Sequence, residues 1–211
     1  IGDPAIQYES RIDEFHTCPN SGRQNSSNPC SEYMWVDDTS CNLASLNLTR
    51  FTDSEGNLDV EAYSRACRTV LIAQDIANSI GSYPHPDIAQ VSPEFRTTGL
   101  GYANLGALLM RKGLPYDSEE ARAFAAAVTA LMHGAAYRTS AELAKELEPF
   151  IHYDLNREPM LRVIKKHQAA LDGINWGLVD QKELECSTRA LWKDVIEQGE
   201  RFGFRNAQVT V

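Results

Sequence analysis

Four side chains that could carry out radical or acid–base chemistry lie close together near the start of the chain. Asn28, Cys30 and Glu32 fall within five positions of a proline-containing loop, and Cys41 follows eleven residues after Cys30. An amide can hold hydroxyl groups, a thiol can act as a nucleophile or a one-electron site, and a carboxylate can move a proton. The loop could therefore bind a hydroxylated ligand and react with it.

Two other interpretations of these residues stay open on spacing alone. In the first, Asn28-Pro29 forms a turn, Cys30 packs as a small hydrophobic residue and Glu32 is solvated. In the second, a zinc ion binds one histidine and three cysteines in a non-enzymatic interaction module. The steps of twelve and eleven residues between the cysteines lack the short paired spacing of structural zinc sites. The zinc set would consist of His16, Cys18, Cys30 and Cys41.

The loop is followed by a strand. Residues 1 to about 28 are polar and rich in Ser, Asn, Pro and Gly, which predicts a long loop, and long loops often carry function. Residues 41–48 alternate as a half-buried strand does, and the polar run 53–57 predicts a turn after it.

The rest of the chain has the period of helices. Asp59 can cap a first helix, and Gly81, Pro84 and Pro86 end it. Its apolar residues at three- and four-residue spacing are expected to face the core: Val60, Tyr63, Ala66, Cys67, Val70, Leu71, Ile76 and Ile80. Further helices are predicted over 103–111, from Asp117 or Ser118 to Leu147, over 158–171 and over 183–202, with a tight glycine turn at 96–102 and a final strand at 206–211.

This order of elements predicts an α/β fold in which a long helical excursion connects two strands. Two or three strands are too few to cover so many helices, so the sheet is expected to be completed elsewhere. The chain starts at Ile1 and stops within a β-prone run at Val211, from which we expect an internal piece of a longer chain.

Composition excludes several classes of protein. The 211 residues include 29 Asp+Glu and 20 Lys+Arg, a net charge of −9 without a basic cluster, which argues against binding nucleic acid. No apolar run is long enough for a membrane span. The five unevenly spaced cysteines predict a reducing, cytoplasmic compartment rather than a disulfide scaffold.

Three segments together resemble the large catalytic chain of ribonucleotide reductases, in particular the adenosylcobalamin-dependent class. They are Asn28-Pro-Cys-Ser-Glu32, Cys41-Asn-Leu-Ala-Ser-Leu-Asn-Leu48 and Gly99-Leu-Gly-Tyr-Ala-Asn-Leu-Gly106. The resemblance covers essentially the whole chain and implies a fragment of a ten-stranded α/β barrel with a finger loop. It assigns the finger-loop region to 1–40, a barrel strand to 41–48, mainly helices to 59–205 and the start of the next strand to 206–211.

The resemblance also implies a role for each residue of the loop. Cys30 becomes a thiyl radical when the cobalt–carbon bond of adenosylcobalamin breaks, and it removes the 3′-hydrogen of a ribonucleotide. Glu32 takes the proton of the 3′-hydroxyl, while Asn28 holds the ribose hydroxyls and Ser27 belongs to the same substrate site. The 2′-hydroxyl leaves as water. Cys41 is one of two thiols that reduce the intermediate and end as a disulfide.

Several parts of such an enzyme are expected outside this chain. The resemblance places the second thiol on an earlier barrel strand. None of the other cysteines is a good candidate for it, since Cys67 and Cys186 fall on predicted helices and Cys18 precedes the finger. The phosphate-binding loop would follow Val211. The chain is therefore expected to be inactive without the remainder of the reductase, which acts on ribonucleotides, more specifically diphosphates, to supply deoxyribonucleotides for DNA synthesis. A thioredoxin-type dithiol and a homodimer are further implied partners, and the alternative within the family draws its radical from a separate subunit.

Overall fold

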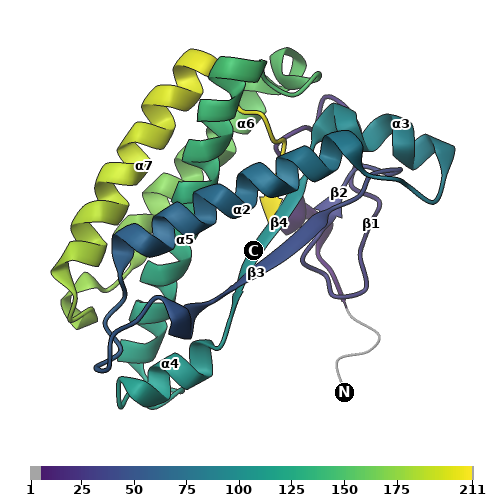
Figure 1. The fold of residues 1–211 in the computed structure, drawn as a ribbon. Helices are drawn as coiled ribbons and strands as arrows, with labels where there is room; N and C mark the ends of the chain where they lie inside the picture. The colour runs from purple at the N-terminus through teal and green to yellow at the C-terminus, as the bar shows by residue number, and fades with distance from the viewer. Residues whose placement is uncertain (1–5, 211) are drawn as a thin grey trace.

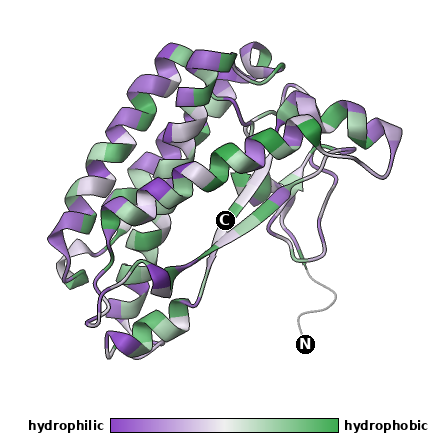
Figure 2. Ribbon diagram, in the orientation of Figure 1, coloured by the Kyte–Doolittle hydropathy of each residue, from purple (hydrophilic) through white to green (hydrophobic). Residues whose placement is uncertain are grey.

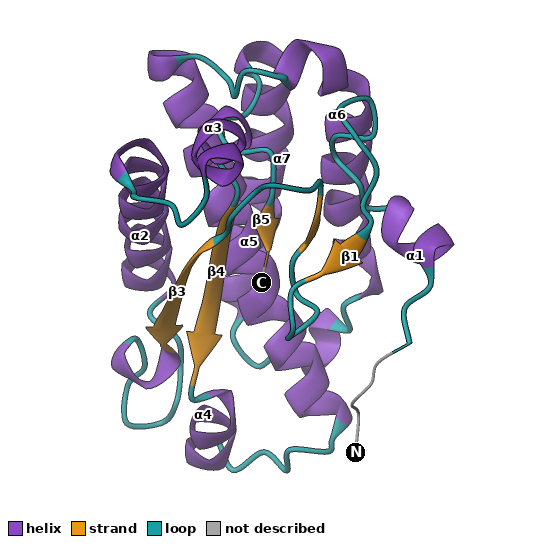
Figure 3. Cartoon of the chain, turned by 90° about the vertical axis from the view of Figure 1, so that its right-hand side faces the viewer, coloured by secondary structure: helices purple, strands orange, loops and turns teal. Residues whose placement is uncertain are grey.

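A three-stranded parallel sheet organises the computed structural model, which describes residues 6–210. β3 (Asn42–Asn47) pairs with β4 (Thr98–Ala103), and β4 pairs with β5 (Val209–Thr210). Figure 3 shows β3 and β4 side by side with their arrows in the same direction. Since parallel neighbours cannot be joined by a short hairpin, long helical connections must link these strands.

The first connection consists of α2 (Val60–Ile80) and α3 (Pro86–Phe95). The carboxylate of Asp59 accepts a hydrogen bond from the amide of Ala62 at 2.8 Å, so the predicted cap of α2 is confirmed. The sequence pattern predicts no helix at α3, because prolines usually end helices. Pro86 occupies the first helical position, where a missing N–H costs nothing.

The C-terminal half of α2 buries a polar face instead of the expected apolar one. Ile76 and Ile80 are 52% and 77% exposed, so their assignment to the core is wrong. Gln74, Asp75 and Asn78 are buried in their place. This half of α2 lies over the sheet near the start of its strands, where backbone carbonyls need donors (Figure 1).

Gln74 shows how this polar face serves the sheet. Its side-chain amide donates to the carbonyl of Asn42 at 2.8 Å and to the carbonyl of Gly99 at 2.5 Å, which joins β3 to β4. The amide of Asn78 donates to the carbonyl of Thr97 at 3.4 Å. A hydrophobic side chain at these positions would leave the carbonyls unpaired, at a cost of about 1–3 kcal/mol each.

A buried ion pair fixes the same end of the sheet. The Arg96 guanidinium donates to the Asp75 carboxylate at 2.8 Å, to the Asp75 carbonyl at 2.6 Å and to the Ser79 hydroxyl at 2.7 Å. The side-chain amide of Asn206 donates to the same carboxylate at 3.0 Å and to the Arg96 carbonyl at 2.9 Å. α2 and the segments that enter β4 and β5 are thus held by one network.

Removing Arg96 should therefore loosen the sheet. We expect Arg96→Ala to lower the local unfolding free energy by about 3–5 kcal/mol, because it removes the nearest cation of the buried Asp75 carboxylate and leaves it with the more distant Arg205, 3.7 Å away. Hydrogen exchange of the β4 amides in the complete protein measures this loss. The control is Arg65→Ala, which removes an exposed ion pair with Glu61. This variant should change the local unfolding free energy by less than about 1 kcal/mol. Equal effects of the two variants would refute the structural role of the pair.

The second connection is also helical, and its longest helix packs against α2 and β5 on the side of the sheet that α2 covers (Figure 1). It contains α4 (Leu105–Arg111), α5 (Glu119–Leu147), α6 (Tyr153–Ala170) and α7 (Lys182–Phe202). Figure 2 shows hydrophobic and hydrophilic residues alternating along these helices, as expected when one side faces a core. Within residues 6–210, no helix combines the length and hydrophobicity that crossing a bilayer requires.

Small residues allow α5 and α7 to pack closely. A Cβ atom at Gly134 would lie only 2.8 Å from the indole nitrogen of Trp192, so a larger residue would push the two helices apart. The same indole N–H donates to the Ala130 carbonyl at 2.8 Å, which satisfies the one polar atom of this buried ring.

Most predicted elements are confirmed, and one is wrong. The helices expected over 118–147 and 183–202 are α5 and α7, and the helix expected from 158 begins earlier, at Tyr153. The glycine-containing segment 96–102, expected as a turn, forms most of β4 instead. The expected long N-terminal loop includes α1 (Glu9–Asp13) and β1 (Ser26–Ser27). The short 3-10 helices are Leu48–Arg50, Leu171–Gly173 and Trp176–Leu178.

Candidate active site

The loop that carries the candidate reactive residues is the tip of a β-hairpin. β1 pairs antiparallel with β2 (Met34–Trp35), and we call residues 26–35 the finger hairpin. The backbone N–H of Asn28 donates to the Tyr33 carbonyl at 3.2 Å, and the Tyr33 N–H donates to the side-chain oxygen of Asn28 at 3.0 Å. Asn28 therefore closes the base of the tip with both its backbone and its side chain.

Cys30 lies at the corner of a turn within this tip. The Ser31 N–H donates to the Asn28 carbonyl at 3.1 Å, which makes Asn28 to Ser31 a four-residue turn. Proline at the second position fits this turn because its φ is already fixed. Ser31 adopts a left-handed conformation with φ of 69°. The turn leaves the Cys30 thiol exposed to solvent, where another molecule can reach it.

Asn28 and Glu32 form a hydrogen-bonded pair across the turn. The side-chain amide of Asn28 donates to a carboxylate oxygen of Glu32, which fixes the direction of the carboxylate. The hydroxyl of Ser27 donates to the Asn28 carbonyl at 2.9 Å and accepts a hydrogen bond from the Gln7 side chain at 2.8 Å. Three of the predicted site residues, Ser27, Asn28 and Glu32, are thus linked by hydrogen bonds at one end of the hairpin.

Glu32 lies over a pocket on the face of the sheet that α2 leaves open. The pocket has a volume of about 430 Å³, and its floor is formed by β3 and β4. Leu43 pairs with Gly99 and Ser45 pairs with Gly101, so each glycine leaves space beside a β3 side chain. A Cβ atom at Gly101 would lie 3.4 Å from the Ser45 hydroxyl. The pocket is large enough for a sugar ring beneath the finger hairpin.

Cys41 lies directly before β3, partly buried and within the electrostatic reach of Glu32. Burial and the negative charge of Glu32 raise the pKa of the Cys41 thiol to about 12. Cys41 therefore keeps its proton at neutral pH, and a protonated thiol can donate a hydrogen atom. Cys41 and Glu32 thus interact electrostatically, although Cys41 is not among the residues that line the pocket.

The raised pKa predicts slow alkylation of Cys41, because the thiolate is the reactive form. We expect iodoacetamide at pH 8 to modify the exposed Cys186 well before Cys41. Glu32→Gln removes the negative charge, lowers the Cys41 pKa and should raise its alkylation rate roughly twofold to tenfold. Mass spectrometry of the modified peptides measures both rates. A Cys41 rate that stays the same in Glu32→Gln would refute the coupling between the two groups.

The assembly of a cysteine-tipped hairpin over a parallel sheet agrees with a comparison against protein families. The model of the ribonucleotide reductase barrel domain matches residues 1–211. The chain belongs to the ribonucleotide reductase family. The expected fold class is confirmed as well: the reductase segment is a helix-rich piece of an α/β barrel domain, and its described residues do not close a barrel.

Curated relatives of this reductase segment are named vitamin B12-dependent ribonucleotide reductases. The chain is 53% identical over 210 residues to the one from Rhodopirellula baltica. The match covers 100% of this chain and 20% of that protein. Identity to the Streptomyces coelicolor protein is 47% over 214 residues, 99% of this chain and 22% of the relative. The Agrobacterium fabrum protein is 43% identical over 224 residues, and the match covers 99% of this chain and 18% of that protein. The segment spans about one fifth of the length of these relatives.

The remaining three cysteines of the chain are Cys18, Cys67 and Cys186. Cys67 is buried on α2 and Cys186 is exposed on α7, so their predicted helical positions are confirmed. Cys18 is buried, and burial raises its pKa to about 12. All five cysteines are free thiols, and Cys30 and Cys41 are the two near Glu32 in chain and space.

The zinc-module alternative finds no support in this geometry. Among residues 6–210, no group of three or more His, Cys, Asp or Glu side chains is arranged to hold a metal ion. His16 uses one ring nitrogen with the Gly22 carbonyl at 2.8 Å and accepts from the Cys18 amide at 3.2 Å with the other. Both nitrogens are therefore engaged within the local loop.

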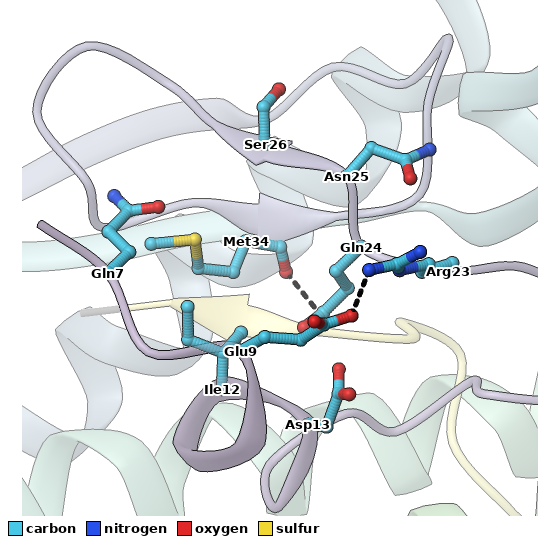
Figure 4. A pocket seen from close by; sticks show the side chains of 9 residues that line it. All are labelled: Gln7, Glu9, Ile12, Asp13, Arg23, Gln24, Asn25, Ser26 and Met34. Atoms are coloured by element: carbon cyan, nitrogen blue, oxygen red, sulfur yellow. Dashed lines mark hydrogen bonds and ion pairs between the residues drawn. The ribbon is translucent and has the colours of Figure 1, made fainter.

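A smaller pocket of about 160 Å³ lies between α1 and the finger hairpin (Figure 4). Its lining is polar: Glu9 pairs with Arg23, and the Gln24 side chain donates to the Met34 carbonyl at 2.9 Å. Neither Cys30 nor any other candidate reactive residue lines it. These contacts support the hairpin rather than form a second reactive site.

Sequence reasoning missed the residues that hold the site in place. Tyr33 and Thr97 belong to a hydroxyl cluster beside Cys41, and Gln74 bridges the strands of the pocket floor. The position of Tyr33 directly after Glu32 is the one feature of the sequence that could have pointed to it. Thr97 and Gln74 reach the site through contacts distant in the chain, which neither spacing nor residue type reveals.

Proposed function

We propose that the complete reductase containing this segment reduces ribonucleoside diphosphates to 2′-deoxyribonucleotides, with adenosylcobalamin as the source of the radical. The names of the relatives support a vitamin B12 cofactor. A relative from Mycobacterium tuberculosis, 32% identical over 149 residues, is named a vitamin B12-dependent ribonucleoside-diphosphate reductase, which supports the diphosphate substrate. We place the reaction in the cytoplasm, where ribonucleotides and reducing dithiols are available.

The observation that carries this proposal is the position of the finger hairpin relative to the pocket floor. Cys30 is exposed at the corner of the tip, and Glu32 lines the pocket of about 430 Å³ above β3 and β4. We place the ribose there, with its hydroxyl groups against Glu32, whose carboxylate accepts a hydrogen bond from Asn28. Positioning of this kind contributes much of the rate in reactions whose difficult step belongs to a cofactor.

Each residue of the site then has one task. Cys30, as a sulfur radical, takes the 3′-hydrogen atom, which forms an S–H bond and leaves the unpaired electron on C3′. Glu32 accepts the proton of the 3′-hydroxyl, and the 2′-hydroxyl leaves as water. Asn28 and Ser27 hold the hydroxyls and the carboxylate in place. Cys41 and a second thiol from another part of the reductase supply the proton that leaves with the 2′-hydroxyl as water, a hydrogen atom for C2′ and one electron, and the two thiols end as a disulfide. Cys30 then returns its hydrogen atom to C3′, which restores the sulfur radical.

The residues present fit a cofactor that acts at the tip of the hairpin. When bound, adenosylcobalamin supplies a carbon radical by breaking its cobalt–carbon bond. The exposed thiol of Cys30 is the group of this segment that can meet such a radical. An external dithiol of the thioredoxin type would reduce the disulfide afterwards, and the complete enzyme would act as a homodimer.

The test is turnover by the complete reductase with adenosylcobalamin, a dithiol and no second protein. We expect deoxynucleotide to form, with a higher kcat/KM for a ribonucleoside diphosphate than for the triphosphate of the same nucleoside. Product that forms only when a separate radical-generating subunit is added would favour the other reductase class. Preference for the triphosphate would contradict the proposed substrate.

A further inference from the structure

A cluster of hydroxyl groups lies between the finger hairpin and the sheet. The phenol oxygen of Tyr33 lies 2.8 Å from the Thr39 hydroxyl and 2.9 Å from the Thr97 hydroxyl. The Thr97 hydroxyl donates to the Ser40 carbonyl at 2.5 Å, and the Tyr33 phenol is 3.4 Å from the same carbonyl. The cluster therefore surrounds the backbone immediately before Cys41.

The protons of this cluster are fully used. Thr39 donates to the Val36 carbonyl at 2.7 Å, and Thr97 donates to the Ser40 carbonyl. Tyr33 has a single O–H, so it donates to one of the two threonine hydroxyls at a time while its oxygen lies within hydrogen-bond distance of both. Burial raises the pKa of the Tyr33 phenol, so it stays a donor at neutral pH. Phenylalanine at this position would remove the phenol oxygen that links the hydroxyls of Thr39 and Thr97.

Tyr33 also belongs to the tip of the hairpin through its backbone. Its N–H and carbonyl both bond Asn28, and Glu32 is its neighbour in the chain. The same residue thus contacts the tip through its main chain and the segment before Cys41 through its side chain. Thr97, on the other side of the phenol, is fully buried and directly follows Arg96, which the Asp75 network fixes.

We propose that the Tyr33 phenol is a positioning residue that sets the place of the Cys41 thiol relative to the tip that carries Cys30 and Glu32. The proposal rests on the proposed function, in which two sulfur atoms act in turn on one substrate. Cys30 and Glu32 stay fixed to the tip by Asn28 even without the phenol. Loss of the phenol therefore affects the later step, reduction by Cys41, more than the first step, removal of the 3′-hydrogen.

The test compares Tyr33→Phe with wild type in the complete reductase, using a ribonucleotide with tritium at the 3′ position. Hydrogen taken by Cys30 exchanges with water as S–H, so tritium release reports the first step and deoxynucleotide reports the last. We expect kcat to fall roughly tenfold or more, as small displacements of reacting groups do, with KM within about twofold of wild type. The ratio of deoxynucleotide formed to tritium released should fall as well.

Matched variants separate positioning from general damage. Thr97→Val should lower the same ratio and Thr97→Ser should restore it, since serine keeps the hydroxyl; this pair decides the matter if Tyr33→Phe does not fold. Tyr116→Phe, at an exposed tyrosine, should leave both measurements unchanged. An unchanged ratio in both Tyr33→Phe and Thr97→Val would overturn the proposal.

A second measurement does not depend on turnover. Without the phenol the segment before Cys41 is less firmly held, so iodoacetamide should modify Cys41 faster in Tyr33→Phe than in wild type. If wild type itself forms no deoxynucleotide, the proposed function is wrong, and this rate alone decides the positioning role. An equal rate in the two proteins would then contradict it.

Discussion

Replacing Cys30 with serine should abolish deoxynucleotide formation by the complete reductase. A serine hydroxyl holds its hydrogen more tightly than a thiol does, so it cannot become the radical that removes the 3′-hydrogen. The change is small and lies at an exposed corner of the turn, where no side-chain packing is lost. Substrate affinity, measured by equilibrium binding of a ribonucleoside diphosphate, should therefore stay within about threefold of wild type.

The matched control is Cys186→Ser, which alters an exposed thiol on α7. It should keep the full turnover rate. Measurable turnover by Cys30→Ser, above the level of a blank without enzyme, would show that another residue carries the radical. Loss of substrate binding in Cys30→Ser would instead show that the thiol has a structural role.

Glu32→Gln should lower kcat by roughly 10²–10⁴-fold, the usual contribution of a general base. Glutamine has nearly the same shape and can still accept the hydrogen bond from Asn28, so the hairpin should keep its conformation. It cannot take a proton from the 3′-hydroxyl. Because the loss concerns the reaction rather than binding, KM should change little, and steady-state kinetics at saturating substrate measures the effect.

Glu55→Gln provides the control for this substitution. Glu55 is exposed in the turn after β3, so its variant should behave as wild type. If Glu32→Gln kept more than about a tenth of the wild-type kcat, general-base catalysis by this carboxylate would be contradicted. The loss would then have to be sought at another proton acceptor.

The parts of the fold that sequence predicts are those governed by neighbouring residues. Asp59 and Ser118 cap α2 and α5, and each cap can be read within three residues of the helix start. β4 could not be predicted in this way. Gly99 and Gly101 suggest a turn locally, but they form a strand because Gly99 pairs with β3 and β5 and Gly101 pairs with β3.

The burial of polar side chains was equally beyond local patterns. Helical spacing places Ile76 and Ile80 on an apolar stripe, yet the buried positions belong to Gln74, Asp75 and Asn78. They are buried because distant carbonyls and Arg96 provide partners, and such partners are visible only in three dimensions.

The candidate site likewise contains some residues that the sequence identifies and others that only the structure identifies. Asn28, Cys30 and Glu32 stand out in the sequence through residue type and spacing within one turn. The pocket floor and the phenol of Tyr33 depend on contacts between segments far apart, such as the one between Tyr33 and Thr97. Reactive groups can thus be found from sequence, whereas the groups that position them require the structure.

The most direct test of the account is hydrogen exchange between Cys30 and the cofactor. The complete reductase is incubated with adenosylcobalamin in deuterated water, and deuterium at the 5′ carbon of the recovered cofactor is measured by mass spectrometry. The Cys30 thiol exchanges with solvent, so its hydrogen atom carries the label to that carbon. We predict deuterium in the cofactor with wild type and none with Cys30→Ser. Deuterium incorporation by Cys30→Ser, or none by an active wild-type enzyme, would contradict the assignment of Cys30 as the radical residue.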